Sequence, residues 1–121
     1  MSKEEELKKI LEEFESLSDV VGSAIVRRDG LIILSGLPTN VNGKGEAAMA
    51  AAIVGTGETA SKELNMGKLR QVIVESEMGK LVSIGAGETS ILTALVRENA
   101  NMGLVLLEME KAAKKISRIL G

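Results

Sequence analysis

The 121-residue sequence contains no cysteine, histidine, tryptophan or tyrosine, and Phe14 is its only aromatic residue. Without cysteine there are no disulfide bonds and no thiolate ligands, and without histidine there is no imidazole to hold a metal or to act as a general base. The composition therefore predicts neither a cofactor nor a metal, and it requires no oxidising compartment. The near absence of aromatic rings also removes the stacking platforms that bind single-stranded nucleic acids.

The sequence also lacks an excess of one charge and a long apolar run. Its 15 basic and 17 acidic residues are mixed along the chain and give a net charge of −2, which disfavours a basic surface for nucleic acid. No apolar stretch approaches the roughly 18 residues of a membrane span. The first residues, MSKEEELKKILEEF, are charged and do not resemble a signal peptide. We therefore expect a single cytoplasmic domain over residues 1–121 that neither binds nucleic acid nor spans a membrane.

Hydrophobic periodicity predicts eight elements in the order αββαβββα. The expected helices cover residues 2–18, 46–64 and 101–120, and the expected strands cover 21–27, 31–35, 69–75, 80–85 and 90–96. Asp29-Gly30 predicts a hairpin turn in which both residues adopt positive φ. Short connections favour a mainly antiparallel sheet, and strands that are apolar on both faces require helices on both sides. The sequence thus predicts an α/β (α+β) fold, a three-layer α/β/α sandwich around five strands.

The middle helix carries the segment AAMAAAIVGTGETASKEL, residues 47–64, which has no polar stripe over residues 47–54. Met49 and Ile53 lie on one of its faces, and Ala50, Val54 and Gly57 lie on the adjacent one. A helix that is apolar all round is normally buried all round, and the sheet covers only one side of it. A twofold dimer that pairs this helix with its copy buries the other side. The alternative is an alanine-rich helix that tolerates exposure to water.

The pattern GxGE occurs three times, at residues 43–46, 55–58 and 85–88. A phosphate-binding loop needs its glycines between a strand and the start of a helix, where free N–H groups point at the phosphate. The second copy lies inside a predicted helix and the third joins two strands. The first copy lies at a helix start and contains Lys44, but it lacks the GxxxxGK[ST] spacing. Turns and close packing explain these glycines better than phosphate binding.

Side chains for catalysis are not recognisable in the sequence. Asp19 and Asp29, the only aspartates, lie in predicted turns, and the glutamates lie mostly on helix faces or strand ends, as solvated residues do. We therefore expect a protein that is not an enzyme. A phosphotransfer or hydrolytic enzyme that uses Lys44 or Glu46 is the least favoured interpretation. Four arginines have two open interpretations, contact with an acidic partner or solvated strand edges: Arg27, Arg28, Arg70 and Arg97.

Four segments together resemble the Roadblock domain, the family that includes dynein light chains and the bacterial and archaeal partners of small Ras-like GTPases. The segments are SAIVRRDGLIILSGLP, AAMAAAIVGTGETASKEL, MGKLRQVIVESEMGKLVSIGAG and NANMGLVLLEMEKAAKKI, in that order along nearly the whole chain. The resemblance implies a profilin-like fold and a homodimer in which the middle helices pair and the third strands join two sheets. The implied interface residues are Met49, Ala50, Ile53, Val54, Gly57, Ser61, Val72 and Val74.

The same resemblance implies a non-catalytic adaptor or regulator that binds a small Ras-like GTPase or a related protein complex. It does not select one GTPase, and none of the five arginines carries a motif that marks an arginine finger. The alternative function is a small-molecule or nucleotide sensor with its pocket between the sheet and a helix. The aliphatic composition of the core and the lack of aromatic residues to line a pocket argue against a large cofactor there.

Overall fold

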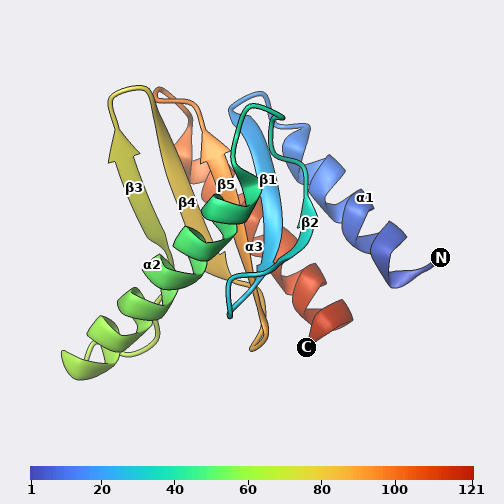
Figure 1. Ribbon diagram of the computed structural model, residues 1–121. Helices are drawn as coiled ribbons and strands as arrows, with labels where there is room; N and C mark the ends of the chain where they lie inside the picture. The colour runs from blue at the N-terminus through green and yellow to red at the C-terminus, as the bar shows by residue number, and fades with distance from the viewer.

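The computed structural model describes residues 1–121, which form one five-stranded antiparallel sheet with helices on both faces (Figure 1). The elements are α1 (Lys3–Glu15), β1 (Val20–Arg27), β2 (Ile32–Ser35), α2 (Gly43–Glu63), β3 (Val72–Ser76), β4 (Gly79–Gly85), β5 (Ser90–Val96) and α3 (Met102–Leu120). The strand order is β2-β1-β5-β4-β3. α2 crosses one face of the sheet, while α1 and α3 cover the other. The predicted order of elements and the three-layer arrangement are confirmed.

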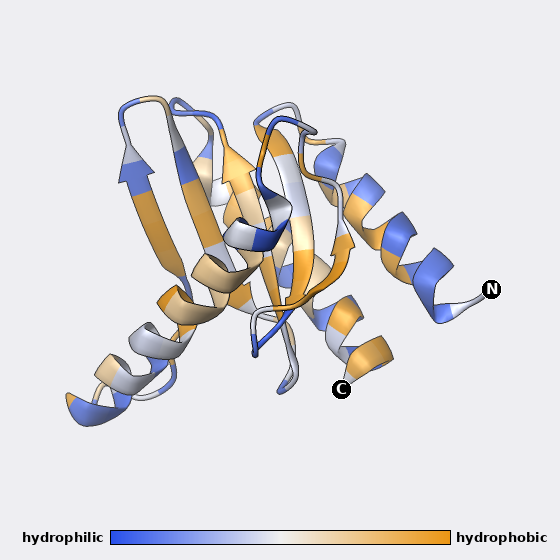
Figure 2. Cartoon of the chain, in the orientation of Figure 1, coloured by the Kyte–Doolittle hydropathy of each residue, from blue (hydrophilic) through white to orange (hydrophobic).

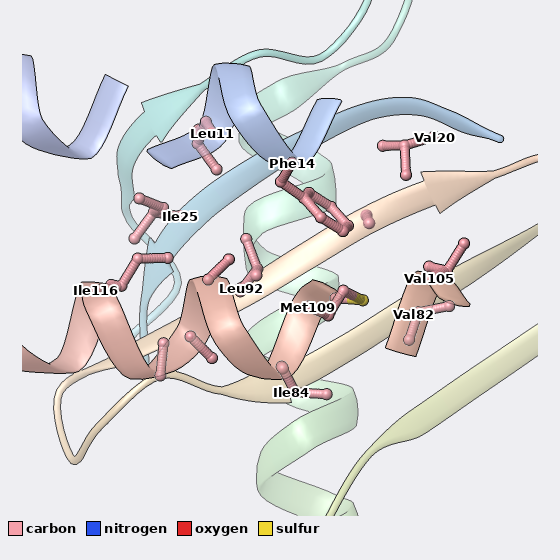
Figure 3. Close-up of a cluster of buried hydrophobic side chains, with 14 of the residues drawn as sticks. Leu11, Phe14, Val20, Ile25, Val82, Ile84, Leu92, Val105, Met109 and Ile116 are labelled. Atoms are coloured by element: carbon pink, nitrogen blue, oxygen red, sulfur yellow. The ribbon is translucent and has the colours of Figure 1, made fainter. Parts of the chain in front are cut away.

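The larger core lies between the sheet and the pair α1 and α3 (Figure 3). Helical spacing places Leu7, Leu11 and Phe14 on the inner face of α1, where all three are buried. Met109 and Ile116 of α3 meet them over β1, β4 and β5. Sixteen buried residues belong to this cluster, so this side of the molecule supplies most of the hydrophobic stabilisation of the fold.

The core beneath α2 is smaller and is made of smaller side chains. Its six buried residues are Ala24, Val26, Ala47, Ala50, Val54 and Ile91. The inner stripe of α2 thus rests on the sheet through two alanines and one valine. Because the apolar area removed from water sets the hydrophobic contribution, α2 is held to its own chain less strongly than α1 and α3 are.

The side chains that cap the helices set where α2 starts and stops. Asn42 accepts a hydrogen bond from the Gly45 N–H at 3.1 Å, so α2 begins at Gly43 and the predicted start at Glu46 is wrong by one turn. At the other end, Asn65 and Gly67 have positive φ, 55° and 82°. The Met66 N–H reaches the carbonyl of Ser61 at 2.8 Å, which completes a Schellman cap.

The first helix and the first hairpin also differ from their predictions. α1 ends at Glu15 rather than near residue 18. The carboxylate of Glu15 accepts hydrogen bonds from the N–H and hydroxyl of Ser23 on β1, at 3.0 and 2.7 Å, and so ties the end of α1 to the sheet. In the hairpin only Gly30 has positive φ, 95°, so the prediction for Asp29 is wrong. A type I turn followed by a glycine bulge closes the hairpin, since Gly30 N–H donates to Arg27 C=O at 2.9 Å.

β3 starts three residues later than predicted, at Val72 instead of residue 69. Its pairing with β4 runs from Val72 opposite Ser83 to Ser76 opposite Gly79. The preceding residues pass around the end of α2, and there Leu69 packs on the smaller core rather than joining the sheet. The last residues of β4, Ile84 and Gly85, therefore pair with β5 but have no neighbour on the β3 side.

Candidate interaction surfaces

The outer face of α2 is a flat surface of small side chains. A shallow hollow of about 500 Å³ runs along it, lined by Ala51, Ala52, Gly55, Thr56, Thr59 and Ala60. Most of these residues are exposed, whereas the opposite stripe of the helix is buried on the sheet. Small side chains along a helix allow another backbone to approach closely. The surface therefore has the shape that suits a second helix.

Gly55 and Gly57 lie two residues apart on α2 but have different surroundings. A Cβ at Gly57 would lie 3.1 Å from Cδ2 of Leu69 and 3.3 Å from Cγ2 of Val72, so the packing of this chain explains that glycine. A Cβ at Gly55 would have no neighbour within 4 Å. Glycine inside a helix costs about 1 kcal/mol relative to alanine. Nothing within the protomer offsets this cost at Gly55.

A free strand edge lies beside this helix face. β3 is the last strand of the sheet, and its outer backbone groups have no partner strand. The side chains of Ile73 and Val74 are 40% and 39% exposed. Figure 2 shows apolar colours along β3 and weakly apolar colours across the middle of α2. Isolated edge strands of this kind are usually shielded by charge or proline, and β3 has neither before Glu75.

The predicted interface residues fall into two groups. Met49, 56% exposed, Ile53, half-buried, and Val74 lie at the surface, with Val72 partly covered beside Gly57. Ala50, Val54 and Ser61 are buried against the sheet of their own chain, with 0%, 1% and 7% exposure. These three have almost no surface to offer a partner, because they occupy the inner stripe of α2. The exposed small residues of the outer face, such as Ala52 and Thr56, have the surface that these three lack.

Glu46 is buried, which corrects the expectation that the glutamates are solvated. It is 4% exposed, and its Oε1 accepts a hydrogen bond from the hydroxyl of Thr93 at 3.0 Å. Thr93 in turn lies 2.8 Å from the hydroxyl of Ser83, while Oε2 of Glu46 has no hydrogen-bond partner. Burial raises the pKa of this carboxyl above its ordinary value of 4.5, and the bond from Thr93 opposes the shift.

The earlier start of α2 explains why the sequence reasoning missed this site. With the helix beginning at Gly43, Glu46 lies in the first turn and its side chain faces the middle of the sheet. Alternation along the strands offers a signal, since Ser83 and Thr93 interrupt otherwise apolar positions. None of the five main clefts of the molecule has Glu46 in its wall. The carboxylate therefore has the geometry of a buried polar contact, and no substrate-sized space adjoins it.

A second feature outside the α2 face is a cluster around Arg28. Its Nη1 donates to both carboxylate oxygens of Glu58, at 2.8 and 2.9 Å, and its Nη2 donates to the carbonyl of Gly87 at 2.9 Å. The three residues come from the β1–β2 turn, from α2 and from the β4–β5 loop. A Cβ at Gly85 would lie 2.8 Å from Nη2 of Arg28, so that glycine makes room for the guanidinium.

The GxGE pattern at residues 55–58 lies within α2. The copy at residues 85–88 begins at the last residue of β4 and continues into the loop before β5. The expected close packing is confirmed at Gly57, which packs on Leu69, and at Gly85, which packs on Arg28, but not at Gly55, where a Cβ would have no neighbour within 4 Å. None of the three helices combines the length and the apolar character that crossing a membrane demands.

Comparison with known proteins adds independent findings. The family model of the Roadblock/LC7 domain matches residues 6–96. The uncharacterized protein MJ1340 of Methanocaldococcus jannaschii is 39% identical over 108 residues, which cover 89% of this chain and 94% of that protein. Both findings show the family of the chain, because the family model and the relative each match more than half of its residues.

Solved structures share the same fold. The gliding protein MglB from Thermus thermophilus superposes with a TM-score of 0.89 at 20% identity, covering 98% of this chain and 91% of that one. A Roadblock/LC7 domain from Streptomyces avermitilis has a TM-score of 0.85 at 23% identity and covers 93% and 95% of the two chains. With its helices, its five-stranded profilin-like sheet and its sequence match in agreement, the chain belongs to the Roadblock/LC7 domain family.

Proposed function

We propose that this chain acts as a homodimer that binds a small Ras-like GTPase and has no catalytic activity of its own. The observation that carries the proposal is the outer face of α2 with its unexplained Gly55, next to the unpaired edge of β3. A twofold axis beside β3 would pair each of these surfaces with its own copy. The pairing would bury exposed apolar side chains such as Met49 and Val74.

The weak attachment of α2 to its own sheet supports the dimer. Six mostly small buried residues hold this layer, against sixteen on the other face. Leu81 and Leu95, on the α2 side of the sheet, are only half-buried because α2 does not cover this part. A second α2 laid beside the first would cover the remaining apolar surface, as the hydrophobic effect favours.

The GTPase part of the proposal rests on membership of the Roadblock/LC7 domain family. The relatives named above differ from this chain in most of their residues, so they do not identify its partner.

Equilibrium sedimentation of an α2 variant tests the dimer. Ala52→Glu places a charge at the centre of the outer face, where the side chain is exposed and does not disturb the core. We expect the native chain to be a dimer at micromolar concentration and Ala52→Glu to be a folded monomer. Lys8→Glu, on the exposed side of α1, is the matched control and should remain dimeric. A native chain that is monomeric would overturn the proposal.

Affinity capture from the native cytosol tests the GTPase. The tagged chain, Ala52→Glu and Lys8→Glu are compared with GDP or a non-hydrolysable GTP analogue present, and bound proteins are identified by mass spectrometry. We expect the native chain and Lys8→Glu to retain a Ras-like GTPase and Ala52→Glu to lose it. Capture of no Ras-like GTPase by an intact dimer would refute this part and leave the dimer standing.

A further inference from the structure

Two clefts join at the end of the sheet where β3 leaves β4. They have volumes of about 1270 and 450 Å³, and they share Arg70, Gly85, Gly87 and Ser117 in their walls. The space exists because the chain before Val72 passes around the end of α2, so that the edge of β4 at Ile84 and Gly85 is left bare. The C-terminal half of α2 forms one wall, and the end of α3 forms the other.

Basic side chains are concentrated around these joined clefts, which we call the basic cleft. Six of the 15 basic residues of the chain line it: Arg28, Lys62, Lys68, Arg70, Lys114 and Arg118. Only three of the 17 acidic residues do so: Glu58, Glu88 and Glu110. A chain with an overall charge of −2 therefore has a locally positive concave surface, which attracts acidic partners.

The pairing of these charges shows which of them are available. Arg28 is the only one of the six that makes an ion pair within the chain, with Glu58. Its hydrogen bonds to Glu58 and Gly87 fix it as part of the wall. The other five are free to bind a ligand, and Arg70 lies where the two clefts meet.

We propose that the basic cleft binds an acidic, extended polypeptide segment of a partner protein. The larger of its two clefts alone, at about 1270 Å³, exceeds the roughly 300–1,000 Å³ typical of small-molecule sites. It contains no aromatic side chain on which a nucleobase could stack. Glu88 and Glu110 lie among the cations, where they can accept hydrogen bonds from the N–H groups of a peptide backbone, and the sugar–phosphate backbone of DNA has no such donor. Arg70 lies where the two clefts meet, so it is placed to contact an acidic partner, one of the two interpretations left open for it by the sequence.

This inference goes beyond the proposed GTPase-binding role and does not depend on it. Fluorescence anisotropy with a labelled deca-glutamate peptide provides the test, with a deca-(Gly-Ser) peptide of equal length as the neutral probe. We expect the full chain to bind the acidic probe only, and to bind it more weakly as salt rises. The charge reversal Lys68→Glu with Arg70→Glu should weaken binding at least about tenfold, since charge-pair couplings of this kind are large.

The control reverses two exposed lysines on α1, Lys3→Glu with Lys8→Glu, which changes the net charge equally. It should weaken binding less than about twofold, because it leaves the basic cleft intact. If the charge reversal lowers the melting temperature of the chain, the neutral double variant Lys68→Gln with Arg70→Gln replaces it in the binding measurement. Equal losses in cleft and control variants would overturn the proposal, as would tighter binding of ATP, inorganic phosphate or oligo-dT than of the acidic peptide. Sedimentation of the cleft variants, expected to match the native chain, separates this result from failure of the dimer.

Discussion

Arg28 forms an ion pair with Glu58 in which its Nη1 donates to both carboxylate oxygens, at 2.8 and 2.9 Å. Thirty residues separate the two in sequence, and the pair ties the β1–β2 turn to the second half of α2. α2 has little apolar attachment of its own, so this polar contact is one of the few that fix its direction over the sheet. The placement of the outer face of α2 depends on it.

Replacing Arg28 with alanine should lower the free energy of unfolding by about 1 kcal/mol or less, because both partners are partly exposed and solvent screens the pair. Arg27→Ala is the matched control. Its pair with Asp29 joins residues two apart in an exposed turn and should contribute only a few tenths of a kcal/mol. Urea denaturation of both variants makes the comparison. A loss at Arg27 as large as that at Arg28 would contradict the role of the Arg28 contact.

Gly55→Ala and Gly57→Ala form a second matched pair. Both replacements gain helix propensity of about 1 kcal/mol. At Gly57 the new methyl group crowds Leu69 and Val72, so the protomer should gain less stability than at Gly55, where no neighbour lies within 4 Å. Gly55→Ala should instead weaken the dimer, because the methyl group lies on the surface where the second helix approaches. Thermal unfolding and sedimentation are measured on the same samples, and a Gly55→Ala dimer as tight as the native one would count against the helix pairing.

Glu46 predicts a specific dependence of stability on pH. Burial raises the pKa of its carboxyl in the folded state above 4.5, so the folded chain holds this proton at pH values where the unfolded chain has released it. The stabilising contribution is therefore fully present below about pH 4.5 and is lost as the pH rises through the folded-state pKa. Relative to Glu46→Gln, which does not titrate, the native chain should gain stability as the pH falls from 7 to 4.

The sign of this gain follows from burial, which raises the pKa of the Glu46 carboxyl more than the hydrogen bond from Thr93 lowers it. Guanidinium denaturation of both proteins across the pH range measures it, and using the difference between them cancels the contributions of the exposed carboxylates. Glu4→Gln, in the exposed first turn of α1, controls for loss of one charge. The difference in free energy of unfolding between the native chain and Glu46→Gln could be independent of pH or could change in the opposite direction. Either result would show that the carboxyl of Glu46 is hydrated in the folded chain.

Phe14 is the only aromatic residue, and it lies 3% exposed in the larger core between α1 and the sheet. Phe14→Ala should lower the free energy of unfolding by about 3–5 kcal/mol through lost burial and the cavity that remains. Phe14→Leu should cost less, because it retains most of the volume. Differential scanning calorimetry measures both, and nearly equal, small losses would mean that this core repacks freely.

The sequence predicted the order of elements and the layers well because the strongest signals were periodic. The stripe Leu7, Leu11 and Phe14 fixes the inner face of α1, and the both-sided apolar strand around Leu92 requires helices on two sides. Caps were visible as well, since Asn101 accepts a hydrogen bond from the Leu104 N–H at 3.2 Å at the predicted start of α3.

The prediction failed where tertiary contacts override local pattern. The sequence predicted that the third strand starts at residue 69, yet residues 69–71 pass around the end of α2 and thereby open the basic cleft. Composition along α2 showed that the helix is apolar on several sides, but could not tell its sheet-facing residues, such as Val54, from its outward ones, such as Ala52. That distinction depends on the rotation of the helix, which Glu46 and its hydrogen bond to Thr93 help to set.

Sedimentation equilibrium of the native chain at micromolar concentration tests the central claim most directly. A particle of twice the 12.8 kDa chain mass, reduced to one chain by Ala52→Glu without loss of helical signal, is the result we predict. A well-folded particle of 12.8 kDa for the native chain at that concentration would contradict the claim.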